Sequence, residues 1–206
     1  MIGPTADVEK FARFYESDFG KLILEKEAEY IQKELKDCDK ILDVGCGIGI
    51  FEERLSGLDI TGLDISEEMI TEAGKRSDKK FVVGDAENMG FDDASFDGVL
   101  YVAALEFIAD YKKAVRESWR VTRPDGKLLV LMLNPSSRYF HEQSEDKDSY
   151  FRRVLHTDVD EIRDYIAEFY EIVKEEYFLG ITGKEVFETR DKKYAGLYAV
   201  VGKKNR

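Results

Sequence analysis

Short apolar runs alternate along the chain with segments in which apolar residues recur at helical spacing. That spacing predicts one helix over 6–19 and another over 22–36. From residue 40 onward, apolar runs predict strands, and helical patterns return between them. The predicted strands are 40–44, 59–63, 80–83, 96–102 and 127–133, and the helices between them are 50–56, 66–76 and 110–121.

Strands that alternate with helices predict βαβ units and a mainly parallel sheet with helices on both faces. Residues 134–156 are polar and aromatic without a clear period, and a helix is predicted from Thr157 to Tyr170. Two β-rich segments, 171–179 and 194–202, then predict an antiparallel pair. The expected fold is therefore α/β, a Rossmann-like three-layer sandwich whose seven-stranded, mainly parallel sheet ends in a C-terminal antiparallel strand pair.

Composition narrows the class of protein. The chain has 206 residues and a net charge of −12, which suits one domain and disfavours a nucleic-acid partner, because phosphates would be repelled. No apolar run is long enough to cross a membrane, and the first residues lack a secretory signal. Two cysteines and two histidines predict no metal site, and we expect a cytoplasmic protein. The oligomeric state is not predictable.

A glycine-rich turn joins the first strand to the next helix, in the sequence Asp43-Val44-Gly45-Cys46-Gly47-Ile48-Gly49. Such a turn lets a ligand approach the backbone beside the N-terminus of a helix. A dinucleotide fingerprint would need its third glycine at position 50, which is Ile50. Carboxylates at Asp43, Glu52 and Glu53 would also repel a pyrophosphate, so the turn favours a ligand that carries positive charge.

This turn resembles motif I of the class I S-adenosylmethionine-dependent methyltransferases, in particular the group of ubiquinone and menaquinone biosynthesis methyltransferases. The resemblance runs over about residues 10–133 and includes 91–97 and 119–127, where Asp125 replaces the usual glycine. It implies S-adenosylmethionine as cofactor, with the acid at Asp64 on the ribose hydroxyls. It also implies an adenine contact from Asp85 and from the backbone of Ala86.

The resemblance gives a set of expected cofactor-binding residues, spread over the predicted N-terminal helix and the successive strand ends. They are Tyr15, Asp43, Gly45, Cys46, Gly47, Gly49, Asp64, Ile65, Met69, Asp85, Ala86 and Val102.

The acceptor side is less specified by the sequence. Methyl transfer is an in-line displacement that depends mainly on positioning, so no catalytic residue is assigned, and His141, Glu106 and Tyr15 are candidates only. The segment after the fourth strand, 103–107, lacks the Asn/Asp-Pro-Pro-Tyr motif that accompanies amino-group methylation of DNA and of protein glutamine. Aromatic residues at Phe11 and in 138–141 predict a small, partly apolar acceptor under a lid.

We therefore expect a single methyltransferase domain over 1–206 that acts on a small molecule. Its parts would be a helical cover (1–36), a cofactor-binding core (37–133), a lid and substrate segment (134–170) and a closing β-hairpin (171–206). A non-catalytic regulatory protein that binds S-adenosylmethionine, or a protein or RNA methyltransferase, remains an alternative. The acceptor itself is not predictable.

Overall fold

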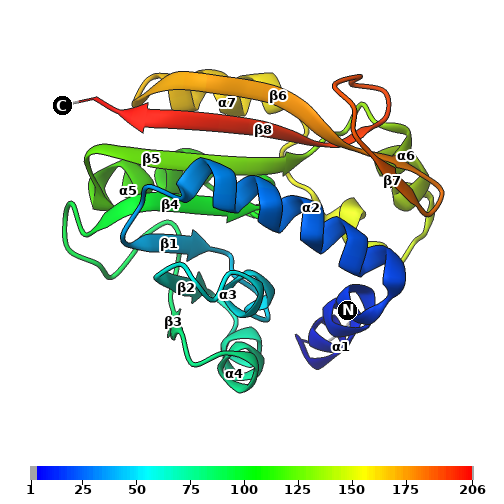
Figure 1. Cartoon of the computed structure of the whole chain (residues 1–206), viewed down its shortest axis with the longest axis horizontal. Coiled ribbons are helices and arrows are strands. Elements are labelled where there is room, and N and C mark those ends of the chain that lie inside the picture. The colour runs from blue at the N-terminus through cyan, green and yellow to red at the C-terminus, as the bar shows by residue number, and fades with distance from the viewer. Residues whose placement is uncertain (1–3, 206) are drawn as a thin grey trace.

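A computed structural model describes residues 4–205 and shows a single eight-stranded sheet with helices on both faces (Figure 1). The strands follow one another across the sheet in the order β3-β2-β1-β4-β5-β8-β6-β7. The first five strands are parallel, and β8 and β6 then run antiparallel to their neighbours. Their bounds are β1 Ile41–Val44, β2 Ile60–Asp64, β3 Lys80–Val83, β4 Phe96–Val102, β5 Thr122–Leu133, β6 Tyr170–Thr182, β7 Glu185–Phe187 and β8 Ala195–Lys204.

The helices form two layers around this sheet. In Figure 1, α2 crosses the front of the sheet, whereas α5 and α7 lie behind it. The helix bounds are α1 Pro4–Glu16, α2 Asp18–Leu35, α3 Ile50–Arg54, α4 Glu67–Arg76, α5 Tyr111–Val121, α6 Arg138–Glu145 and α7 Val159–Ala167, with 3₁₀-helices η1 Leu105–Phe107 and η2 Tyr150–Arg153. Within the described residues, no helix combines the length and the apolar character needed to cross a membrane.

Strand β5 shows why this sequence builds two cores. Successive side chains of a strand point to opposite faces of the sheet. Leu129 and Leu131 therefore join the apolar cluster beneath α2, while Leu128 and Val130 join the cluster beneath α5 and α7. All four side chains are fully buried, as expected for a central strand covered on both faces.

The predicted fold class is confirmed, but the predicted strand number of seven is wrong. The eighth strand, β7, has three residues, pairs only with β6 and follows a turn at Gly183, whose φ is +60°. A strand of three residues is too short to produce a recognisable alternation in the sequence.

The parallel strands bring their carboxyl ends to one edge of the sheet. Val44 pairs with Leu63, and Leu63 pairs with Val82, so β1, β2 and β3 end side by side. Strand β4 pairs with β1 and β5 in the same direction. Residues that follow these strands therefore meet at one edge, which is where ligands bind in open α/β sheets.

Candidate functional site

A cavity of about 470 Å³ lies at the carboxyl edge of the parallel strands and extends beneath α1 and α6. Most of the residues that the sequence predicted to bind cofactor line this cavity. They are Tyr15, Asp43, Gly45, Cys46, Gly47, Asp64, Ile65, Met69 and Val102.

The turn after β1 requires glycine at Gly45. This residue has a φ of +78°, and a Cβ there would come within 2.7 Å of the Cβ of Ala104. Its N–H donates to the carbonyl of Leu63 over 2.7 Å, which fixes the turn to the end of β2. Gly47 also has a positive φ, of +54°, but a Cβ there would meet nothing within 4 Å. The backbone at Gly47 thus lies open beside the cavity.

Asp64 ties the glycine turn to the beginning of α4. Its Oδ2 accepts a hydrogen bond from the N–H of Gly47 over 2.9 Å, and its Oδ1 accepts one from the N–H of Ser66 over 2.9 Å. Ser66 in turn caps α4 by accepting from the N–H of Met69 over 3.2 Å. Each carboxylate oxygen keeps further acceptor capacity, so Asp64 can still bind hydroxyl groups of a ligand in the cavity.

Three acidic residues, Asp43, Glu52 and Asp64, are concentrated around this turn, and none of them forms an ion pair within the described residues. Asp43 and Glu52 are 1% and 0% exposed, and Asp43 Oδ2 and both carboxyl oxygens of Glu52 lack any hydrogen-bond partner within the described chain. Burial, followed by the charges of Glu52 and Asp64, raises the pKa of Asp43. Burial also raises the pKa of Asp64, and it raises that of Glu52 to about 7. A cationic ligand in the cavity would relieve this arrangement, whereas a pyrophosphate would oppose it.

Three of the predicted cofactor residues do not line the cavity. Gly49 immediately precedes α3 and has a φ of +71°, and a Cβ there would come within 2.8 Å of Ala73, so glycine is required at this position for backbone conformation and packing. Asp85 is exposed and accepts from the N–H of Glu87 over 2.8 Å, and Ala86 is part of the same turn.

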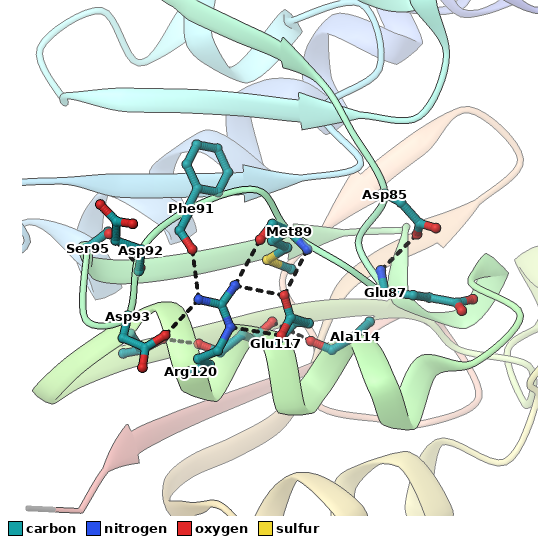
Figure 2. Close-up of polar contacts among 12 residues, drawn as sticks. Asp85, Glu87, Met89, Phe91, Asp92, Asp93, Ser95, Ala114, Glu117 and Arg120 are labelled. Atoms are coloured by element: carbon teal, nitrogen blue, oxygen red, sulfur yellow. Dashed lines mark hydrogen bonds and ion pairs between the residues drawn. The ribbon is translucent and has the colours of Figure 1, made fainter.

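Arg120 of α5 holds the loop that follows this turn (Figure 2). Its guanidinium donates to the carbonyl oxygens of Met89 and Phe91 over 2.8 and 2.7 Å, and to both carboxyl oxygens of Glu117 over 2.8 Å. Asp93 completes the network at 2.8 Å. Glu117 of α5 also accepts from the N–H of Met89 over 2.8 Å, so two side chains of α5 fix the loop between β3 and β4.

Two segments far apart in the sequence, α1 and residues 148–153, meet above the cavity. We call these two segments the roof. The guanidinium of Arg153 pairs with the carboxylate of Asp7 over 2.7 Å, and the ring of Phe11 lies 5.0 Å from that of Tyr150. Asp7, Phe11 and Tyr150 also line the cavity, so the roof contacts lie directly above it.

Beyond the glycine turn the cavity continues into an aromatic chamber, defined by Tyr15, Tyr139 and Phe151, with apolar residues of β6 and β8 behind them. One acid lies in this chamber, Glu27 of α2, which is 6% exposed. Sequence analysis did not single out Glu27. A signal was present, because Glu27 lies on the same helical stripe as the buried Leu24 and Ile31.

The three catalytic candidates occupy different places. Tyr15 lines the cavity, and His141 is exposed on α6 and does not. Glu106 is fully buried behind the wall, where its Oε1 accepts from the N–H of Leu133 over 2.8 Å and its Oε2 has no partner in the described residues. Burial raises the pKa of Glu106 to about 7. Its backbone carbonyl also accepts from the N–H groups of Leu155 and His156, so Glu106 joins three segments behind the site.

Comparison with known proteins agrees with this geometry. Residues 42–130 match the family described as a methyltransferase domain. Demethylmenaquinone methyltransferase of Thermotoga maritima is 36% identical over 108 residues, which cover 50% of this chain and 47% of that protein. Malonyl-[acyl-carrier protein] O-methyltransferase of Erwinia billingiae is 38% identical over 108 residues, or 51% of this chain and 42% of that protein. The matched stretch thus spans less than half the length of these relatives.

A solved structure from Thermotoga maritima resembles the whole chain. It is described as an S-adenosylmethionine-dependent methyltransferase and possible histamine N-methyltransferase, and it superposes with a TM-score of 0.83 over 96% of each chain at 23% identity. At that identity the likeness shows the fold. The matched domain, the related sequences and the shared fold agree with one another: residues 42–130 belong to the methyltransferase-domain family, and the chain has the fold of an S-adenosylmethionine-dependent methyltransferase.

Proposed function

We propose that the protein transfers a methyl group from S-adenosylmethionine to a small molecule. The observation that carries this proposal is the continuity of one cavity, which runs from the glycine turn and Asp64 to the aromatic chamber. A site for cofactor alone would end at the turn. The additional chamber provides room for an acceptor beside the cofactor.

The residues of the cavity fit S-adenosylmethionine. When bound, this cofactor supplies a methyl group on a positively charged sulfur, which an acceptor atom can take in a single displacement. The unpartnered carboxyl of Asp43 would face positive charge, and Asp64 would bind the ribose hydroxyls. The open backbone at Gly47 would allow close approach. The roof would exclude water and hold the acceptor in place, which lowers the barrier mainly through positioning.

The acceptor is proposed to be small and partly apolar. The related proteins are named for demethylmenaquinone and for malonyl-[acyl-carrier protein], and the chamber here is enclosed by aromatic rings beneath the roof. The net charge of −12 disfavours an RNA substrate. The two free cysteines are both buried, which suits the proposed cytoplasmic location.

A non-catalytic cofactor-binding protein is the second candidate. It is favoured by the position of His141, which is outside the cavity and leaves no histidine at the acceptor chamber. It is disfavoured by the chamber itself, because a regulatory protein needs no enclosed space beside the cofactor.

Calorimetric titration tests the cofactor site. We expect S-adenosylmethionine and S-adenosylhomocysteine to bind, NAD to remain silent, and Asp64→Ala to weaken binding about 10- to 100-fold through loss of charge-assisted hydrogen bonds. Asp59→Ala is the matched control, because Asp59 is an exposed acid at the opposite end of β2 and should leave affinity unchanged. If neither S-adenosyl compound binds, the proposed function is wrong.

A further inference from the structure

Glu27 is a buried acid without a visible structural role. It lies on the buried face of α2, between Leu24 and Ile31, and 6% of its surface is exposed. Its Oε2 has no hydrogen-bond partner in the described residues. A buried carboxyl that makes no bond is costly for the fold, and a polar group of this kind calls for an explanation. The carboxyl also borders the cavity, so a ligand there can reach it.

The surroundings of Glu27 are aromatic and lack positive charge. Burial, followed by the charge of Glu27, raises the pKa of Tyr15, and the same two causes raise the pKa of Tyr139 to about 12. Both tyrosine hydroxyls therefore lie close enough to Glu27 to interact with its charge. The ring of Phe14 packs edge-on against Tyr15 at 5.1 Å, and that of Phe151 packs edge-on against Tyr139 at 5.5 Å.

The only lysine or arginine among the described residues that line the cavity is Lys10. Its ammonium group is already hydrogen-bonded to the carbonyl oxygen of Asp148 in the roof. Lys10 is therefore not available to Glu27, and a ligand in the cavity can supply the partner that its carboxyl lacks.

The chemistry of the chamber distinguishes between classes of acceptor. A carboxylate would be repelled by Glu27 and Asp43, and a purely apolar molecule would leave Oε2 unpartnered. An ammonium group would form a charge-assisted hydrogen bond with Glu27, and the aromatic faces favour a cation. We propose that the methyl acceptor is a small amine and that Glu27 binds its nitrogen. This inference rests on the proposed function and specifies its substrate class.

Binding of the ammonium group favours the ionised form of Glu27, and the ionised carboxylate can then take the proton that blocks the reaction. An amine that enters as an ammonium ion has no free electron pair, and transfer of one proton to the Glu27 carboxylate generates the neutral amine. The nitrogen lone pair then forms a bond to the methyl carbon, and the carbon–sulfur bond breaks with its electrons remaining on sulfur. The positive charge passes from sulfur to nitrogen, and Glu27 returns its proton to solvent when the methylated amine leaves.

The test compares molecules of similar size that differ in their polar group. Phenethylamine and hexylamine are the amine probes, and 4-ethylphenol and hexanoate are the controls, each supplied with S-adenosylmethionine that carries a labelled methyl group. We expect label in the two amines only. We expect Glu27→Gln to lower kcat/KM for phenethylamine at least 30-fold, while calorimetry shows unchanged binding of S-adenosylhomocysteine.

Glu29→Gln is the matched control on the same helix, because Glu29 is exposed and pairs with Lys26 over 2.8 Å. It should behave as the unmodified protein does. Unchanged binding of S-adenosylhomocysteine also shows that each variant is folded. The inference is overturned if that compound binds while neither amine is methylated, if the phenol or the carboxylate is methylated in preference, or if Glu27→Gln retains full activity. Absence of cofactor binding would instead overturn the proposed function.

Discussion

The buried carboxyl of Glu27 makes the stability of the protein depend on pH in a way that one substitution can isolate. Burial alone raises the pKa of Glu27 from 4.5 to about 8, and no neighbouring charge contributes appreciably to this change. The acids around the glycine turn act on one another, but Glu27 is not among the causes of their altered pKa values. Glu27→Gln keeps the shape of the side chain and removes its titration.

The magnitude follows from the two pKa values. Below about pH 4.5 the carboxyl is protonated in both folded and unfolded chains and costs nothing through ionisation. As the pH rises towards 8, the unfolded chain loses this proton and the folded chain retains it, so the folded state loses relative stability. The loss amounts to about 3 kcal/mol at pH 7 and about 5 kcal/mol at pH 9.

Urea unfolding at pH 5, 7 and 9 measures this cost. The free energy of unfolding of Glu27→Gln, minus that of the unmodified protein, should increase by about 2 to 3 kcal/mol from pH 5 to pH 7 and by about 1 to 2 kcal/mol more by pH 9. Glu29→Gln should show no such trend, because its carboxyl is exposed. A difference that stays constant across the three pH values would refute the argument that Glu27 is protonated through burial.

Two further substitutions test the frame of the site. Gly45→Ala should lower the free energy of unfolding by about 1–3 kcal/mol, because its φ is +78° and the new Cβ would come within 2.7 Å of Ala104. Gly57→Ala is the control, because a Cβ there meets nothing within 4 Å, and it should lower the free energy of unfolding by less than half as much in the same urea titration. Arg120→Ala should lower the unfolding free energy by about 1–3 kcal/mol. Arg120→Lys should recover only part of this loss, because an ammonium group cannot reproduce the contacts of the guanidinium with Glu117 and with the loop carbonyls. Equal melting temperatures for these variants and the unmodified protein would contradict the assigned roles.

The sequence predicted the parallel core because each part of it leaves a local signal. Residues 128–133 of strand β5 form a continuous apolar run, and the glycines at Gly45 and Gly47 mark a turn whose positive φ angles the structure contains. The order of these elements follows from general rules on parallel sheets. Asp43 and Asp64 both line the cavity, because the ends of parallel strands meet at one edge.

Features that depend on contacts between distant segments could not be predicted in the same way. The roof joins Asp7 to Arg153 and Phe11 to Tyr150 across more than a hundred residues, and no local pattern links them. Strand β7 forms only because β6 is present beside it. Glu27 gave a signal that was visible and not used, because an acid on an apolar helical stripe is easily mistaken for an exposed position.

The unpartnered acids around the glycine turn imply that the site exchanges protons as well as ligand. Burial raises the pKa values of Asp43 and Glu52, and the charge of Asp64 adds to the increase at both, so the turn of the free protein holds protons more tightly than exposed carboxyls do. A cation that enters the cavity favours the ionised carboxylates and lowers these pKa values. Binding of the cofactor would then release protons. The affinity of the protein for the cofactor would therefore increase as the pH rises. The heat measured on binding consequently includes the heat of protonating the buffer.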